Sequence, residues 1–375
     1  MQARNFKNLS GELAGSLGDL GTFLPYAIGA ITIANLDVTG VLVMCGLMYL
    51  FTAWFYRLPI PVQPMKVIGA AIIVNHFTAG EIAAAGIIIG LTMLVIGLTG
   101  AIEKLASITP ACVTLGIQTG LGVTLAVLGV KMVSSDWLIG VPVMLAMLLL
   151  LNNRYFPASI VAIVGGTALS FALYPELSLP SLNIGLSIPH FIWPAASDYS
   201  RGFLQGALPQ FPLTLTNSVL VTTYLASQLF PGQSGRVTDK NLCLTVGIGN
   251  LIGAPLGIIP ICHGSGGLAA HYRFGARTHY ATAFIGSSLL LIGLLLGSSG
   301  LQLLQLIPSA VLGGMLFYSG LDLVKAIDTR DSLEMFVFAG VVVLSIALNP
   351  AIGFVSGLII YWFSKKVKDV ISVRD

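Results

Sequence analysis

Apolar runs of about 20 residues recur along the whole length of this 375-residue chain. Each run is long enough to cross the roughly 30 Å hydrocarbon core of a bilayer as a helix. Hydrophobic residues make up 55% of the sequence and charged residues only 9%, whereas a soluble domain carries about a quarter charged residues. The chain is therefore predicted to be an all-α polytopic integral membrane protein.

The same composition disfavours several other classes of protein. The net charge of +3 is too small to indicate a nucleic-acid partner. The N-terminal residues lack a short apolar core followed by a cleavage site, so no cleaved signal peptide is expected. Because no nucleophile–base pair, metal-ligand cluster or nucleotide-binding loop is found, we expect neither enzymatic activity nor a cofactor. At least three of the four cysteines, which have no paired spacing, are expected to be buried small hydrophobic residues: Cys45, Cys112, Cys243 and Cys262.

The apolar runs divide into two sets of seven predicted spans. The first set lies near residues 11–36, 40–56, 63–77, 82–102, 108–131, 136–151 and 157–174. The second set lies near residues 202–230, 239–256, 263–273, 277–297, 300–324, 334–348 and 350–368. Between them, residues 175–201 are rich in proline and serine and are expected to form an external connector.

The positions of lysine and arginine support this number of spans. If the N-terminus is cytoplasmic, 15 of the 18 lysines and arginines fall in predicted inner loops. Of the other three, Lys131 and Arg201 fall on the external side and Lys66 lies within the membrane. This strong positive-inside bias predicts that both termini are cytoplasmic. The inner set is Arg4, Lys7, Arg57, Lys104, Arg154, Arg236, Lys240, Arg273, Arg277, Lys325, Arg330, Lys365, Lys366, Lys368 and Arg374.

The two sets of spans also resemble each other in sequence. Four short motifs recur in the same order at offsets of 191 to 199 residues, starting at residues 11 and 202, 60 and 259, 109 and 307, and 156 and 349. The third match aligns Gly122 with Gly320. Because seven spans per copy is an odd number, the second copy must enter the membrane from the opposite face. The sequence therefore predicts an inverted repeat of residues 1–174 and 202–375, an arrangement typical of alternating-access transporters.

The third and tenth predicted spans are unusually short and begin with proline-rich stretches, "LPIPVQP" and "GIIPICHG". Proline prevents a helix from continuing, and the residue before it favours an extended conformation. We therefore expect short extended stretches that reach the middle of the membrane, followed by half-helices that begin near Gln63 and near His263. Such backbone is tolerated at membrane depth only where protein or a water-filled cavity covers it.

Two half-helices that enter from opposite faces would point their N-termini at a common place. Each N-terminus offers unpaired backbone N–H groups and about half a positive charge. Lys66 adds a full charge, and the glycines of "HGSGG", including Gly264 and Gly266, let a ligand approach the backbone closely. This combination predicts a binding site for an anion. The alternative for Lys66 is that its side chain extends to the membrane interface, as lysines near helix ends do.

The first and eighth predicted spans are expected to complete the site. They offer hydroxyl and amide groups, which are the neutral donors suited to a tetrahedral oxyanion. Gln63 and Gln210 lie at breaks in their spans and are expected to contact the ligand or to support the site. The serines and threonines have an alternative role, which is to hydrogen-bond to their own helix backbone. The full candidate binding set is Asp19, Thr22, Gln63, Lys66, Gln210, Thr214, Asn217, Ser218, Cys262, His263, Gly264, Ser265 and Gly266.

Two members of this set are candidates for proton coupling. Asp19 is an acid within the membrane and is either a proton carrier, a neutral structural acid or the partner that orients Lys66. His263, at the start of a half-helix, is expected to donate to the substrate or to titrate during transport. Because His263, Cys262 and His271 lack the spacing of metal ligands, no metal site is predicted. Glu12, nearer the cytoplasmic edge, is expected to be solvated.

Three motifs indicate a family. "GDLGTFLPY" and "PVQPMK" resemble the two signature motifs of the molybdate transporter family, relatives of the sulfate permeases, and "GNLIGAPLGIIPICHGSGGLAAHYRFGAR" resembles its second-half motif. The resemblance covers essentially the whole chain. It implies the seven-plus-seven inverted-repeat fold, in which a core domain moves against a gate domain, with molybdate as substrate and tungstate as a second candidate. Proteins of this fold are often dimers through the gate domain, so a homodimer is expected.

Sulfate permeases usually carry a cytoplasmic STAS domain after the last span, whereas this sequence ends at "SKKVKDVISVRD". The absence of that domain agrees with the molybdate transporters. The lack of a transit peptide favours residence in a bacterial inner membrane.

The leading functional hypothesis is a secondary transporter that imports molybdate by alternating access. Proton symport would offset the membrane potential, which opposes inward movement of a dianion. Molybdate, tungstate and sulfate are all tetrahedral dianions, so a sulfate transporter or an anion channel fits the same residues. A proton-coupled nucleobase transporter of the same fold is less favoured, because such carriers place a carboxylate at the tenth-span break and "PICHGSGG" has no acid.

Overall fold

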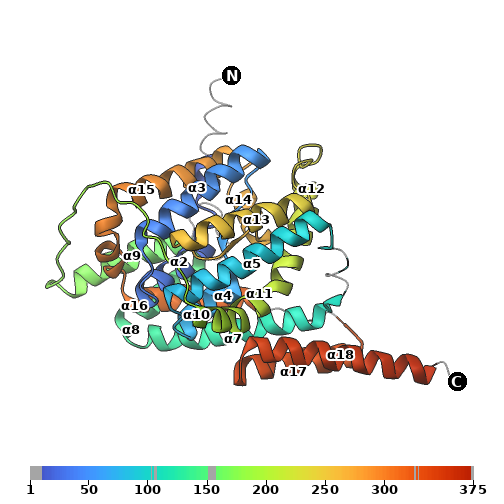
Figure 1. The fold of residues 1–375 in the computed structure, drawn as a ribbon. Helices are drawn as coiled ribbons and strands as arrows, with labels where there is room; N and C mark the ends of the chain where they lie inside the picture. Colours follow the sequence, from blue (N-terminus) through green and yellow to red (C-terminus); the bar gives the residue numbers. More distant parts are fainter. Residues whose placement is uncertain are drawn as a thin grey trace.

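The structure, a computed structural model, describes residues 11–102, 104, 108–150, 158–324, 327 and 329–372. Helices make up nearly all of its regular structure, as Figure 1 shows. Five of the basic residues assigned to inner loops lie outside the described residues: Arg4, Lys7, Arg154, Lys325 and Arg374.

The first half of the chain forms a series of apolar helices after a helical stretch at residues 11–16. These helices are α2 (Leu20–Ile33), α3 (Val38–Tyr56), α4 (Lys66–Val74), α5 (Ala79–Thr99), α7 (Ala111–Val133), α8 (Trp137–Leu150) and α9 (Ala158–Leu173). The predicted connector then runs without regular structure as far as α10 (Ala196–Arg201).

The second half begins with one continuous helical stretch that contains two π-helical segments. Its parts are η1 (Gly202–Ala207), α11 (Leu208–Leu213), η2 (Thr214–Leu220) and α12 (Val221–Leu229). Pro209 and Pro212 lie between the two π segments, where missing N–H groups disturb the regular hydrogen-bond pattern. The remaining helices are α13 (Asp239–Gly253), η3 (Ala254–Leu256), α14 (Ser265–Arg273), α15 (Tyr280–Gln305), α16 (Ser309–Leu323), α17 (Ser332–Ala347) and α18 (Pro350–Ser372).

These helices lie close to the predicted spans, with one clear shift. Residues 300–305 continue α15 instead of starting the next span, because Pro308 marks the start of α16. In the described part of the chain, four helices are long and apolar enough to cross a bilayer alone, and a pair bent by 81° would make a fifth. The other helices are shorter or broken, so the number of fourteen spans stays a prediction.

Three pairs of long helices pack closely: α3 with α15, α5 with α13, and α7 with α16. At each crossing, two glycines face each other and bring the backbones together, as is common between membrane helices. A Cβ atom on Gly122 would lie 2.6 Å from the carbonyl oxygen of Gly320, and the reverse distance is also 2.6 Å. The facing pairs are Gly46 and Gly286, Gly90 and Gly247, and Gly122 and Gly320.

The buried apolar side chains form three clusters. The largest joins α2 to α5 with α13 to α15. The second joins α4 and α7 with α16, α17 and α18, and the third joins α8 and α9 with α16. We call the helices α2–α5 and α10–α15 the first helix group, and α7–α9 with α16–α18 the second helix group.

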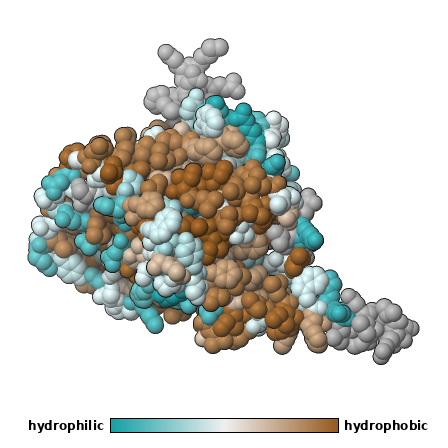
Figure 2. Space-filling view, in the orientation of Figure 1, coloured by the Kyte–Doolittle hydropathy of each residue, from teal (hydrophilic) through white to brown (hydrophobic). Residues whose placement is uncertain are grey.

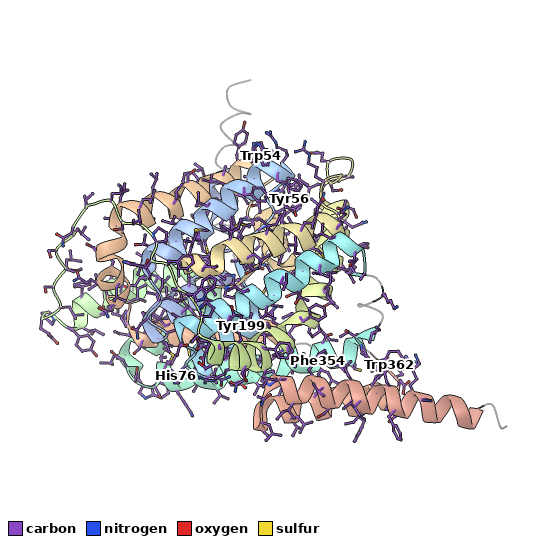
Figure 3. The ribbon with its side chains drawn as sticks, in the orientation of Figure 1. Trp54, Tyr56, His76, Tyr199, Phe354 and Trp362 are labelled. Carbon is purple, nitrogen blue, oxygen red and sulfur yellow. The ribbon has the colours of Figure 1, made fainter. Side chains whose placement is uncertain are left out.

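The outer surface is strongly apolar, as expected for a protein embedded in lipid. Figure 2 shows hydrophobic residues over most of the visible face, with hydrophilic residues at its edges and in a strip through its lower centre. Trp54 of α3 and Trp362 of α18 lie at the periphery in Figure 3 and are 63% and 40% exposed. A protein with this much exposed apolar surface would tend to aggregate in water.

Candidate functional site

Two short strands bring the breaks in the chain together. β1 (Gln63–Pro64) pairs antiparallel with β2 (Ile261–Cys262), the one departure from an all-α structure in the described part of the chain. The N–H of Met65 also donates to the carbonyl oxygen of Pro260, at 2.7 Å. The extended stretches expected from the prolines are thus paired with each other.

A helix of nine residues follows each strand, α4 from Lys66 and α14 from Ser265. These starts lie a few residues later than Gln63 and His263. At the first break Gln63 and Pro64 belong to β1, and at the second Gly264, which directly precedes α14, is still extended. Nine residues make a helix of about 14 Å, roughly half of the hydrocarbon core. The third and tenth segments are therefore short helices, each of which begins a few residues after one of the two paired strands.

Asn250 of α13 holds the second strand in place. Its side-chain oxygen accepts from the N–H of Ile261 and its amide group donates to the carbonyl oxygen of the same residue, both at 2.8 Å. Asn250 is fully buried, so these bonds satisfy backbone groups that a two-residue sheet leaves open. Asn250 was not among the residues predicted from the sequence, although an isolated amide within an apolar span is a usable signal.

Gln210 supports the start of α4. Its side-chain oxygen accepts from the N–H of Val67 at 2.8 Å, and its amide group donates to the hydroxyl of Thr214 at 2.9 Å. The Thr214 hydroxyl in turn donates to the carbonyl oxygen of Gln210 at 3.2 Å. Gln210 therefore occupies one of the N–H groups that the first turn of α4 leaves unpaired, and Thr214 has the structural role of bonding to its own helix.

Asp19 is buried directly before α2 and is bound by neutral partners. The amide group of Gln63 donates to one carboxylate oxygen at 2.5 Å, and the hydroxyl of Tyr49 lies 3.4 Å from the other. Asp19 is 1% exposed. In the described part of the chain it forms no salt bridge with Lys66, and its carboxylate holds the amide group of Gln63.

His263 is also fully buried and uses both ring nitrogens. Nδ1 lies 2.7 Å from the carbonyl oxygen of Pro61, and Nε2 lies 2.9 Å from the hydroxyl of Thr245. Thr245 in turn bonds to the hydroxyl of Tyr56, labelled in Figure 3, at 2.6 Å. His263 thus links the two extended stretches to α13 and α3.

A cavity of about 390 Å³ lies between the first and second helix groups. Five predicted site residues line it, from α2, α4, η2 and α14: Thr22, Lys66, Asn217, Ser265 and Gly266. The other members of the predicted set lie behind this wall: Asp19, Gln63, Gln210, Thr214, Ser218, Cys262, His263 and Gly264.

The wall from the first helix group is rich in hydrogen-bond donors. Lys66, the first residue of α4, is half-buried and forms no salt bridge in the described part of the chain. The hydroxyl of Ser265 donates to the side-chain oxygen of Asn217 at 2.6 Å, which leaves the amide group of Asn217 available to the cavity. A Cβ atom on Gly266 would meet nothing within 4 Å, so the first turn of α14 is open there. A cation, an amide and a helix N-terminus on one wall favour an anionic ligand.

The wall from the second helix group carries polar residues that were not predicted from the sequence. They lie within helices that show no break in sequence, but each is a polar side chain in an apolar span, which is a signal in itself. They are Gln118 of α7, Ser159 of α9, and Tyr318, Ser319 and Asp322 of α16.

Two expectations about other residues have clear outcomes. All four cysteines are buried and free, as expected. The expectation that Glu12 is solvated is wrong, because Glu12 is only 8% exposed. One of its carboxylate oxygens accepts from the N–H groups of Arg277 and Thr278, both at 3.0 Å, and so fixes the turn after α14.

Comparison with known proteins decides the family. The family profile described as "Molybdate transporter of MFS superfamily" matches residues 11–125 and 202–323. The chain belongs to the molybdate transporter family. Molybdate transporter 2 of Arabidopsis thaliana is 32% identical, over 95% of this chain and 88% of its own length. Molybdate transporter 1 of Chlamydomonas reinhardtii is 28% identical, over 93% of this chain and 90% of its own length.

Solved structures identify the fold of this family member. The transmembrane domain of the cyanobacterial bicarbonate transporter BicA matches with a TM-score of 0.69 and 20% identity, over 93% of this chain and 98% of that domain. The murine Solute Carrier 26 family member A9 anion transporter, in its inward-facing state, matches with a TM-score of 0.70 and 16% identity, over 96% and 68%. The chain is thus a membrane transporter with a sulfate permease-like fold.

Proposed function

We propose that this member of the molybdate transporter family is a secondary active transporter of molybdate, and of tungstate, which has the same shape and charge. The observation that carries the proposal is that the first turns of α4, with Lys66, and of α14 line the same cavity of about 390 Å³. This volume is at the small end of the range for ligand pockets and suits a compact oxyanion. The molybdate relatives support the choice of cargo.

The predicted site residues divide into two roles in this proposal. Lys66 neutralises charge, and Thr22, Asn217 and the backbone N–H groups of Ser265 and Gly266 donate hydrogen bonds to the oxyanion. The residues behind the wall hold these donors in place, as Gln210 does for α4 and His263 for the extended stretches. Neutral donors of this kind bind an oxyanion without requiring a cofactor.

We also propose fourteen spans in two inverted repeats, residues 1–174 and 202–375, joined by the connector 175–201. The repeats relate α3 to α13, α4 to α14, α5 to α15 and α7 to α16. If the two repeats are exchanged, the packed pair α3 and α15 becomes the pair α13 and α5, which is also packed in the structure. The pairs α7 with α16 and β1 with β2 stay the same pairs after the exchange. Such reciprocal packing supports a two-fold axis between the repeats.

Alternating access follows if the first helix group, as core, moves against the second, as gate. A second cavity of about 340 Å³ supports this proposal. It is lined by the later part of α2 and the beginning of α16, whereas the first cavity is lined by the beginning of α2 and the later part of α16. The two cavities thus lie one after the other along α2 and α16, where the first helix group contacts the second. A homodimer and cytoplasmic positions for both termini stay predictions.

The alternative is a transporter or channel for another oxyanion. One observation supports this alternative. The bicarbonate transporter BicA, a more distant relative at 23% identity, is named for a different anion. A channel for the same anions would need the same site.

The test is uptake of radiolabelled molybdate into proteoliposomes that contain the purified full-length chain. We expect uptake that tungstate inhibits, that unlabelled molybdate inside the vesicles accelerates, and that uracil does not affect. Faster uptake of sulfate than of molybdate would reject the proposed cargo. Single-channel currents without acceleration by internal substrate would reject the carrier mechanism.

A further inference from the structure

The wall of the cavity formed by the second helix group carries a hydroxyl group that needs a partner. Ser159, one of the first described residues of α9, lines the cavity and is only 3% exposed. Its Oγ atom has no hydrogen-bond partner in the described part of the chain. A buried hydroxyl without a partner is costly, so such a group in a cavity wall indicates a ligand.

Ser159 is accompanied by other polar groups on the same wall. Gln118 of α7 and Ser319 of α16 line the cavity beside it. Tyr318 is already engaged, because its hydroxyl donates to the carbonyl oxygen of Met144 at 2.9 Å. Asp322 completes the polar side chains of this wall, and its carboxylate, if ionised, repels a dianion and favours a position nearer Lys66.

We propose that Ser159, Gln118 and Ser319 form a second half of the oxyanion site, and that Ser159 helps to determine which oxyanion is bound. This inference rests on the proposed function. A tetrahedral oxyanion directs its oxygens to four sides, so Lys66, Asn217 and the first N–H groups of α14 on one wall satisfy only part of them. Donors on the opposite wall complete the set.

The position of these donors has a consequence for specificity. They belong to the second helix group, whereas Lys66 and its neighbours belong to the first, so the oxyanion must reach both groups at once. A larger tetrahedral dianion reaches across the cavity more readily than a smaller one. Removal of the Ser159 hydroxyl should therefore weaken molybdate binding more than sulfate binding.

The experiment measures molybdate and sulfate binding to the purified full-length chain in lipid nanodiscs by calorimetry, together with thermal unfolding without ligand. The variants are Ser159→Ala and Ser345→Ala. Ser345 is a matched control because it is 6% exposed, its hydroxyl also lacks a partner among the described residues, and it lies on α17 outside the cavity.

Both variants should unfold at or above the wild-type temperature, because neither loses an internal hydrogen bond. Ser159→Ala should bind molybdate about tenfold or more weakly, with a smaller change for sulfate, and Ser345→Ala should bind both as the wild type does. If Ser159→Ala does not fold, Ser319→Ala provides the same comparison.

Two outcomes would overturn the inference, and they differ in what else they reject. Wild-type affinity in Ser159→Ala, with the wild type binding molybdate, would reject the second half of the site and leave the proposed function intact. A wild type that binds no oxyanion would reject the proposed function and the inference with it.

Discussion

Gln210 accepts a hydrogen bond of 2.8 Å from the backbone N–H of Val67, a residue 143 positions earlier in the chain. This contact joins the helical stretch after the connector to the first turn of the short helix that carries Lys66. Because both groups are buried, the contact holds the cationic end of α4 at a defined place on the cavity wall.

Substitution Gln210→Leu should destabilise the protein, because it leaves the N–H of Val67 buried without an acceptor. We expect a loss of about 1–3 kcal/mol in the free energy of unfolding, measured by thermal unfolding in detergent. Gln205→Leu is the control, since Gln205 accepts only a longer bond of 3.3 Å from Asn75 in a less buried position. An equal loss in both variants would contradict the special role of Gln210.

Substitution Lys66→Ala should weaken molybdate binding by about tenfold or more, because it removes the charge at the cavity wall. Lys131→Ala removes an equal charge from an exposed position in the last turn of α7 and should leave the affinity unchanged. Calorimetric titration of both variants is the measurement. A similar loss in the two variants would mean that only the overall surface charge attracts the anion.

The two glycines around the start of α14 should respond differently to alanine. A Cβ atom on Gly264 would overlap with the side-chain oxygen of Gln63 and lie 3.3 Å from its Cδ. Gln63 cannot move away easily, because Asp19 holds its amide group at 2.5 Å. Gly264→Ala should therefore destabilise the protein by about 1–3 kcal/mol.

Gly266→Ala should keep the wild-type unfolding temperature, because a Cβ atom there meets nothing within 4 Å. Its methyl group enters the cavity, so molybdate binding should weaken. Thermal unfolding and titration of both variants test this contrast, and a folded, fully binding Gly264→Ala protein would be inconsistent with it.

The crossing of α7 and α16 should not tolerate a side chain at Gly122. Its Cβ atom would lie 2.6 Å from a backbone oxygen of Gly320, so the two helices would have to separate. We expect Gly122→Ala to lower the free energy of unfolding by about 1–3 kcal/mol. Gly165→Ala, on α9 with nothing within 4 Å of its Cβ atom, should be neutral or stabilising by up to about 1 kcal/mol. Thermal unfolding of the two variants distinguishes these outcomes.

Proton coupling through Asp19 predicts a response to pH across the membrane. Inward movement of a dianion is opposed by about 2.3 kcal/mol per charge per 100 mV of inside-negative potential, and a co-transported proton reduces that cost. External acid should accelerate molybdate uptake by the wild type but not by Asp19→Asn.

Asp37→Asn is the control for this experiment, since Asp37 also precedes a helix but caps α3 away from the cavity. Asparagine is an equally good N-cap, so this variant should respond to acid as the wild type does. No acceleration of wild-type uptake would reject proton coupling. A normal response of Asp19→Asn would assign the proton to another group.

Much of the fold follows from local sequence. The apolar runs predict most of the helices to within a few residues, because length and hydrophobicity act within each segment. The prolines at 59–64 and at 260 predict the breaks before α4 and α14 for the same reason. Lys66 at the first break also follows from the sequence, together with the positive end of the helix that it begins.

The role of His263, by contrast, does not follow from the local sequence. His263 directly precedes the glycines of α14, but its ring turns away to Pro61 and Thr245. Its role depends on two partners from other parts of the chain, and no pattern within its own segment encodes them.

The sequence by itself determined the membrane class, the helices, the two breaks and a cation placed beside them, because each depends on residue type and on neighbours along the chain. Only the tertiary structure decided that β1 pairs with β2 and that Ser159 shares a cavity with Lys66. The physical reason is that the rotation and depth of each helix depend on how it packs against helices far away in sequence, and this packing selects which polar side chains face the cavity.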